Sequence, residues 1–207
     1  MTPHVWTPDV WLSADGGAYV LDGGERLDRV TSVLRSLGLG ADYSMVDPEV
    51  LARAQAIGRA THLATALDER GELDEETVDP AVAPRLAAWR AFVRESSWRS
   101  TAIEEPAYST EWGVAGTPDR VGWLNGRRAV LDIKPPSYHP GVIFQLALYA
   151  VLLEPDGRRG EAVETLFSLQ LGEGTYKLID CSKLEPQWRT LAKQILAVHS
   201  AKRRHLK

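Results

Sequence analysis

Apolar and polar residues alternate on both sides of Asn125-Gly126, and this alternation predicts a β-hairpin. One strand ends at Leu124, and the return strand covers residues 129–133. Asn-Gly is the strongest short signal for a two-residue hairpin loop, because both loop residues of that turn need a positive φ. The loop length in turn determines which residues of the two strands face each other.

This register brings two acidic side chains together. Counting outward from the loop places Asp119 directly across from Asp132. Side chains alternate between the faces of a strand, so Asp132 and Lys134 share one face, while the opposite face holds Ala129, Leu131 and Ile133. Two carboxylates about 5 Å apart at Cβ repel each other. A divalent cation between them, with the nearby ammonium of Lys134, would offset this repulsion. The hairpin therefore predicts half of a metal site.

Helical and strand periodicities place the other elements around this hairpin. Two helices are predicted to begin at an Asp-Pro pair, an N-cap followed by proline at the first helical position. The predicted helices run from Val30 to near Gly38, from Asp47 toward Gly71, from Asp79 to about Ser96, over 141–154, and onward from about Leu184. Strands are predicted at 101–108, 165–171 and 175–179. Helix 141–154 is apolar nearly all round, which indicates that it is buried.

The composition is that of a globular chain. It has 207 residues, of which 44% are apolar and 25% charged, enough for one domain with its own core. A net charge of −4 argues against a protein that coats nucleic acid over its whole surface, but not against a local basic groove. The single cysteine, Cys181, excludes an internal disulfide and a cysteine-ligated iron–sulfur cluster within one chain. No apolar run approaches the length of a membrane span.

The acidic residues and the lysine of the hairpin form a known pattern. Pro118-Asp119 followed by Asp132-Ile133-Lys134 resembles the signature of the PD-(D/E)XK nuclease superfamily. Each part alone is common by chance. Both in order, at hairpin register, on a predicted strand–turn–strand, give a specific signal. In this chemistry the two aspartates supply hard oxygen ligands for Mg²⁺, and the Ile133 carbonyl is well placed as another. Lys134 would orient the attacking water or stabilise the developing charge.

A second motif follows on the predicted helix 141–154. Gln145 and Tyr149 lie one turn apart on the same helical face, and Gln145-Leu-Ala-Leu-Tyr149 resembles the QxxxY motif of the RecB/Cas4-like branch of that superfamily. Polar groups in a buried helix need partners. Hydrogen bonds at the catalytic site or contacts to the DNA backbone would supply them, and ordinary satisfaction in the core is the alternative.

His62 is the candidate fourth ligand. A lone histidine on a helix is more often structural. However, Gly58-Arg-Ala-Thr-His62 resembles the GxxxH element in which the RecB-like branch places a metal-binding histidine. A histidine ligand would make Mn²⁺ bind at least as well as Mg²⁺.

Glu104 and Glu105 stand in the predicted strand 101–108. Adjacent strand residues point to opposite faces, so at most one of them reaches the metal. The resemblance favours Glu104, which would complete one metal shell or help to hold a second ion. The alternative is a pair of solvated glutamates.

The resemblance implies an α/β, restriction-endonuclease-like fold, a mixed central sheet flanked by helices, in a single domain. We expect a mostly helical N-terminal part over 1–98, a catalytic core over 99–154, and closing strands with a C-terminal helix over 155–207. The implied activity is metal-dependent hydrolysis of DNA, as an exonuclease of phage or recombination and repair type. An endonuclease or nickase acting on branched DNA is one alternative. A catalytically inert nucleic-acid-binding protein of the same fold is the other.

The implied cofactor is Mg²⁺ or Mn²⁺, without an iron–sulfur cluster, although relatives in the Cas4-like branch often carry one. DNA is the implied partner, and a recombinase, a single-strand-binding protein or a helicase is a candidate protein partner. The start of the chain does not match a signal peptide. We expect a cytoplasmic protein without a membrane partner, in the host cytoplasm if it is phage-encoded.

Overall fold

The structure, a computed structural model, describes residues 10–137, 139–154 and 162–205. Their strands form two mixed sheets of five strands each. The central sheet has the order β10-β9-β8-β7-β4. Its strands are β4 (Arg99–Ile103), β7 (Arg120–Leu124), β8 (Arg127–Lys134), β9 (Thr165–Leu171) and β10 (Tyr176–Asp180). The N-terminal sheet has the order β1-β2-β3-β6-β5. Its strands are β1 (Val10–Leu12), β2 (Ala18–Leu21), β3 (Arg26–Arg29), β5 (Ala107–Ser109) and β6 (Val114–Gly116).

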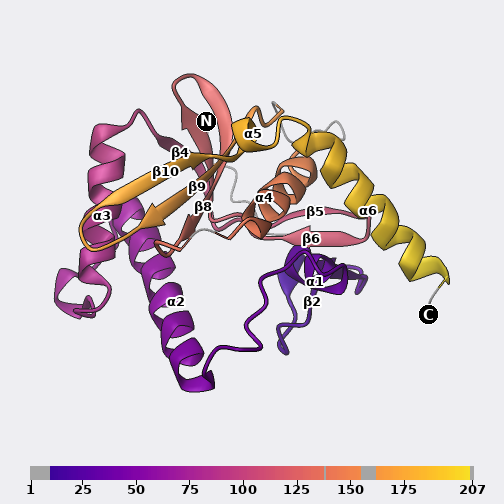
Figure 1. Cartoon of the computed structure of the whole chain (residues 1–207), viewed down its shortest axis with the longest axis horizontal. Helices are drawn as coiled ribbons and strands as arrows, with labels where there is room; N and C mark the ends of the chain where they lie inside the picture. The colour runs from indigo at the N-terminus through magenta and orange to yellow at the C-terminus, as the bar shows by residue number, and fades with distance from the viewer. Residues whose placement is uncertain (1–9, 138, 155–161, 206–207) are drawn as a thin grey trace.

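Helices cover both faces of the central sheet (Figure 1). The helices are α1 (Val30–Ser36), α2 (Pro48–Arg70), α3 (Ala83–Glu95), α4 (Gly141–Leu152), α5 (Cys181–Leu184) and α6 (Trp188–His205), with a 3₁₀ turn at Glu75–Thr77. One apolar core joins α4 and α6 to the sheet face that carries Val130 and Leu166. A second core joins α3 to the face that carries Leu131 and Leu169. The mixed α/β class is therefore confirmed.

The predicted hairpin forms with the expected register. Asn125 and Gly126 are the two loop residues, with φ of 52° and 75°. These positive values are the ones that this turn type requires. Leu124 pairs with Arg127, and the pairing continues without a shift to Arg120 and Leu131. The next pair in this register is Asp119 and Asp132. The predicted alternation is also confirmed, because Ala129, Leu131 and Ile133 enter one core and Val130 the other.

The caps of α2 are those predicted from the sequence. The Asp47 carboxylate accepts hydrogen bonds from the backbone N–H groups of Glu49 and Val50 at the N-terminus. Gly71 closes the helix in the left-handed conformation, with a φ of 71°. The buried residues of this helix, Thr61, Ala64, Thr65 and Ala66, all lie in its C-terminal half. In Figure 1 the N-terminal end of α2 accordingly projects away from the sheets.

Three expectations are corrected. The single central sheet is two sheets, because β1, β2 and β3 form a sheet with β6 and β5, and of these β2 and β3 were not expected from the sequence. The strand predicted over 101–108 breaks at Glu104, whose φ is 53°, so that β4 and β5 lie in different sheets. The helix predicted from Asp79 begins at Ala83 instead, since the Asp79 side chain caps a turn by accepting the N–H of Ala81.

Among the described residues, none of the helices is both long enough and apolar enough to cross a membrane.

Candidate functional site

Two carboxylates stand at the open end of the β7–β8 hairpin. Asp119 directly precedes β7, and its Oδ2 accepts the backbone N–H of Ile133 at 2.6 Å. Asp132 lies in β8 with only 1% of its surface exposed. Its Oδ2 lies 2.7 Å from Nζ of Lys134, while its Oδ1 has no hydrogen-bond partner among the described residues. A buried carboxylate oxygen without a partner is costly and needs an explanation.

The two carboxylates differ in their ease of ionisation. Burial, together with the negative charge of Asp119, raises the pKa of Asp132 to about 6, although the ammonium of Lys134 opposes this shift. Burial acts in the same sense on Asp119, but His62, Lys134 and the N–H of Ile133 outweigh it and lower the pKa of Asp119. The pair therefore holds one firmly ionised carboxylate beside one that gives up its proton near neutral pH.

Two cationic groups complete the cluster. Nδ1 of His62 lies 3.3 Å from Oδ1 of Asp119. Burial alone would lower the pKa values of His62 and Lys134, but the neighbouring aspartates reverse the effect and raise both. A metal ion bound by His62 would have to displace the imidazole proton, so its binding would weaken in acid.

Arg120, which the sequence reading did not single out, locks α2 to the hairpin. Its side chain is fully buried, and its Nε lies 2.7 Å from a carboxylate oxygen of Glu69. Its other nitrogens donate to Thr65 Oγ1 at 3.1 Å and to the backbone carbonyl of Asp119 at 2.7 Å. The guanidinium also lies 5.0 Å from the ring centroid of Trp89. Because Thr65 and Glu69 follow His62 on α2, this contact fixes the helix that presents the imidazole to Asp119. The position of an arginine in an apolar strand is the sequence feature that could have identified this residue.

Glu104 stands at the break between β4 and β5. It is exposed, it lines the same cavity as Asp119, and its N–H donates to the carbonyl of Asp119 at 3.1 Å. Glu105 is also exposed, but it is not among the lining residues. The N–H of Ile133 points to Asp119, and the N–H and C=O of one strand residue point to the same side. The carbonyl of Ile133 therefore faces the Asp119 side as well.

Gln145 and Tyr149 meet on α4. Nε2 of Gln145 donates to the Tyr149 hydroxyl at 3.0 Å, so the two polar groups of this helix partner each other. Burial and the nearby charge of Asp132 raise the pKa of Tyr149. Its ring packs so closely on Gly116 that an added Cβ there would come within 2.5 Å of a ring carbon. Gln145 lines a smaller cavity together with Lys134.

Ser168 and Gln170 of β9 extend the polar face of the sheet. In the parallel pairing of β8 and β9, Ser168 lies beside Asp132 and Gln170 beside Lys134. Both are at least nine-tenths buried. Ser168 Oγ and Gln170 Nε2 find no hydrogen-bond partner in the part of the chain that the structure describes. Two polar residues at alternate positions, within a strand whose only other polar residue is Thr165, are a sequence feature that could have indicated this polar face.

The cluster opens into a cavity of about 810 Å³, which we call the site cavity. It is lined by His62, Asp119, Ile133, Lys134, Glu104 and Thr117, whereas Asp132 lies behind them and is not one of its lining residues. Its wall is formed by α2 and the connector 37–47 that precedes the helix.

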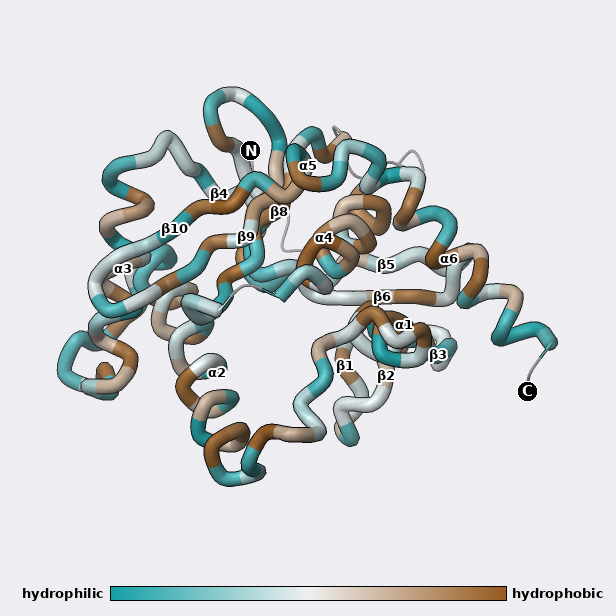
Figure 2. Tube along the Cα trace, viewed as in Figure 1, coloured by the Kyte–Doolittle hydropathy of each residue, from teal (hydrophilic) through white to brown (hydrophobic). Residues whose placement is uncertain are grey.

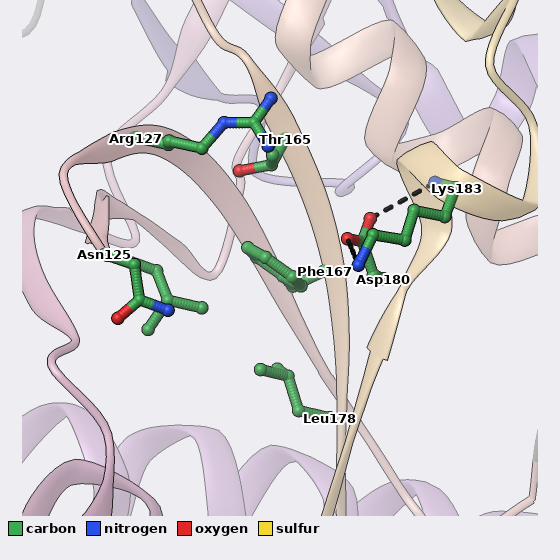
Figure 3. A pocket seen from close by; sticks show the side chains of 8 residues that line it. Asn125, Arg127, Thr165, Phe167, Leu178, Asp180 and Lys183 are labelled. Carbon is green, nitrogen blue, oxygen red and sulfur yellow. Dashed lines mark hydrogen bonds and ion pairs between the residues drawn. The ribbon is translucent and has the colours of Figure 1, made fainter.

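A second cavity, of about 420 Å³, lies at the turn end of the same hairpin (Figure 3). We call it the turn cavity. Figure 3 shows Phe167 near its centre, with Arg127 and Thr165 on one side and Asp180 paired with Lys183 on another. None of the residues predicted for the metal site lines it.

The donors present fit a hard divalent cation. Within residues 10–137, 139–154 and 162–205, no three His, Cys, Asp or Glu side chains are gathered closely enough to hold an ion as they stand. Asp119 and Asp132 nevertheless offer carboxylate oxygens, one of them buried without a partner, and carboxylate and carbonyl oxygens are the ligands that Mg²⁺ and Mn²⁺ take. His62, the Ile133 carbonyl and Glu104 are the further donors within the same cavity.

Comparison with known proteins finds no match to this chain, either among protein-family models or among curated proteins.

Proposed function

We propose that this protein is a metal-dependent nuclease that hydrolyses phosphodiester bonds of DNA. The observation that carries the proposal is the buried Asp132, whose Oδ1 has no partner among the described residues. It lies opposite Asp119 and beside Lys134, two residues that line the site cavity. The resemblance of Pro118-Asp119 and Asp132-Ile133-Lys134 to the PD-(D/E)XK signature supports the same conclusion.

Each residue has a role in this proposal. Asp119 and Asp132 hold Mg²⁺ or Mn²⁺, with the Ile133 carbonyl and His62 as further donors and Glu104 at the side of the site. When bound, the ion neutralises phosphate charge and lowers the pKa of a water. Lys134 orients that water and stabilises the charge that develops on the phosphate. Gln145 lines the smaller cavity beside Lys134, and the Tyr149 hydroxyl positions it by accepting its Nε2 hydrogen bond. Arg120 keeps α2 and its histidine in place.

The geometry favours one rival. Lys134 and His62 already pair with Asp132 and Asp119, and such pairs also stabilise a site that only binds DNA. A catalytically inert DNA-binding protein is therefore the second candidate.

A cleavage assay separates the candidates. The purified protein is incubated with linear duplex, closed circular and single-stranded DNA in Mg²⁺, Mn²⁺ or EDTA. The proposal expects metal-dependent cleavage that Lys134→Ala slows by about 10²–10³. Shortening of linear DNA with circular DNA intact identifies an exonuclease, and linearised or nicked circles identify an endonuclease. DNA that is bound but uncut in both metals would establish the inert candidate, and equal activity of Lys134→Ala would place the cleavage elsewhere.

A further inference from the structure

Exposed apolar side chains of α2 and of the connector that leads to it line the site cavity. Tyr43, Val46, Val50 and Leu63 are exposed by 53%, 39%, 61% and 58%. Figure 2 shows hydrophobic stretches on the projecting N-terminal part of this helix. Together with Leu51 and Ala54, these four residues line the site cavity, and we call the six the apolar wall. Exposed apolar surface gathered in one place marks a site for a partner or ligand.

The apolar wall leads directly to the proposed metal site. Its last member, Leu63, follows His62 on α2, and Gly58 lies one turn before His62 and lines the same cavity. A Cβ built on Gly58 would meet no protein atom within 4 Å. Nothing in the described fold therefore requires a glycine at this position, and the space in front of it is open to a ligand.

The cavity continues past Lys134. A neighbouring cavity of about 230 Å³ lies between the connector, α1 and the start of α4. Tyr43, Lys134, Pro135 and Ser137 line both cavities, so the two spaces meet at Lys134. The connector thus separates two cavities that meet at the ammonium group of Lys134. This arrangement suits an extended ligand better than a small one.

The charges along these cavities suit a polyanion. Arg59 lines the first cavity, Arg35 lines the second, and Lys134 lines both. The acidic residues among the described lining are Glu104 and Asp119, which belong to the proposed metal site itself. A ligand that carries phosphates and large apolar faces matches both the cations and the apolar wall.

We infer that the site takes a single, unpaired DNA strand whose bases lie against the apolar wall while its phosphates pass Arg59, Lys134 and Arg35. This inference rests on the proposed function for the place of cleavage. In a duplex the base faces are stacked inside the helix, whereas an unpaired strand presents them to aromatic and apolar side chains. The wall therefore selects single-stranded DNA, or the frayed end of a duplex.

The test is a binding measurement with three labelled DNA ligands of equal length. They are a single strand, a blunt duplex, and an abasic strand that has the phosphates but no bases. Fluorescence anisotropy is recorded in Ca²⁺ with each DNA shown to be intact afterwards. We expect the wild type to bind the single strand most tightly. Tyr43→Ala/Leu63→Ala should weaken single-strand binding by about 5- to 150-fold, the range for one stacked base, and leave abasic-strand binding unchanged.

A matched control uses exposed apolar residues outside both cavities. Leu184 and Val198 are exposed by 57% and 55%, close to the values for Leu63 and Tyr43. Leu184→Ala/Val198→Ala should bind all three ligands like the wild type. Circular dichroism melting of both double variants checks that each is folded.

Other results overturn the inference. Equal losses on the single and abasic strands, or no loss on either, would mean that the bases do not contact the wall. A wild-type dimer in sedimentation that the wall variant dissociates would make a second copy of this chain the occupant. A different outcome would contradict the proposed function. Wild-type protein that binds the single strand through the wall but cuts no DNA in Mg²⁺ or Mn²⁺ leaves the inference standing and refutes the nuclease.

Discussion

The β7–β8 hairpin has a cavity at each end, and the two cavities use similar residues in different ways. In the turn cavity, Lys183 Nζ lies 3.4 Å from Asp180 Oδ2, and the two side chains are exposed by 80% and 21%. At the site cavity, which Lys134 lines, Lys134 Nζ lies 2.7 Å from Oδ2 of the buried Asp132, and the exposures are 32% and 1%. Asp180 is further satisfied by the Ser182 hydroxyl and the backbone N–H of Lys183. Asp132 Oδ1 has no such partner within the described chain.

The difference shows that residue type and spacing alone do not make a site. An exposed Lys–Asp pair is screened by water and contributes little. A buried carboxylate with an unpaired oxygen has an unfavourable desolvation free energy. Binding of a cation would offset that cost. Matched variants of the two cavities therefore test whether the site cavity is functional and the turn cavity only structural.

The largest expected effect is on metal binding. Asp119→Asn removes half of the carboxylate pair, so calorimetry should detect no Mg²⁺ or Mn²⁺ binding, and cleavage should fall below detection. Asp180→Asn should change neither, because its carboxylate only caps a turn. Normal metal binding by Asp119→Asn would show that the metal does not bind at the hairpin.

Arg120 is expected to dominate stability. Arg120→Met leaves Glu69 without its partner and should lower the free energy of unfolding by about 3–5 kcal/mol, as for other broken buried pairs. Arg127 pairs with Glu164 at 3.5 Å, with 56% and 49% exposure, so Arg127→Met should cost less than about 1 kcal/mol. Urea denaturation measures both. Similar losses for the two variants would contradict the role of Arg120 as the lock on α2.

Lys134 is expected to act on the reaction rather than on metal binding. Lys134→Ala should reduce the cleavage rate by about 10²–10³, the loss typical of one electrostatic donor. Metal affinity should stay within a few-fold of the wild-type value. Lys183→Ala, the equivalent change in the turn cavity, should cleave at the wild-type rate. A loss of metal binding in Lys134→Ala would instead make the lysine a structural part of the metal site.

Asp132 is expected to destabilise the metal-free protein above neutral pH. Its pKa is about 6 in the fold against an ordinary 3.8, so the folded state binds the proton more tightly than the unfolded state does. The contribution of Asp132 to stability therefore falls as the pH rises from about 4 to about 6, by up to about 3 kcal/mol, and the comparison with Asp132→Asn isolates this contribution. In EDTA, Asp132→Asn should be more stable than the wild type at pH 8 and equal to it at pH 4. Denaturation at both pH values, with Asp180→Asn as control, measures the difference. A less stable Asp132→Asn at pH 8 would show that the carboxylate is already well paired.

The smallest expected effect is that of His62. As a ligand, or as the group that orients Asp119, it should contribute about 10- to 100-fold to metal affinity. Because imidazole suits Mn²⁺ better than Mg²⁺, His62→Ala should weaken Mn²⁺ binding more than Mg²⁺ binding. Calorimetric titration with the two ions makes each the control for the other. Unchanged affinities with an intact fold would return His62 to a structural role.

Local chemistry made part of this fold predictable. The Asn125-Gly126 turn gave the hairpin register, and the Asp47 and Gly71 caps gave the ends of α2, because turns and caps depend on a few neighbouring residues. The same register placed Asp119 and Asp132 opposite each other before any tertiary contact was known.

Long-range contacts determine what the sequence did not reveal. The second sheet depends on the parallel pairing of β3 with β6, which are separated by more than eighty residues in the chain, and no local pattern specifies such a partner. The strand breaks at Glu104 because β4 and β5 belong to different sheets. This cause is visible only when both sheets are known. Arg120 is buried at low cost only because Glu69, Thr65 and Trp89 surround it in the fold.

The break at Glu104 also has a mechanical consequence. After the long passage from β3 to β4 through α1, α2 and α3, the chain crosses between the two sheets twice by short segments, from β4 to β5 at residues 104–106 and from β6 to β7 at residues 117–119. The two crossings are tied together by the hydrogen bond from Glu104 N–H to the Asp119 carbonyl. Asp119 therefore stands at the junction between the two sheets, whereas Asp132 lies inside β8 of the central sheet. An ion held by both aspartates would therefore also tie the junction of the two sheets to the interior of the central sheet.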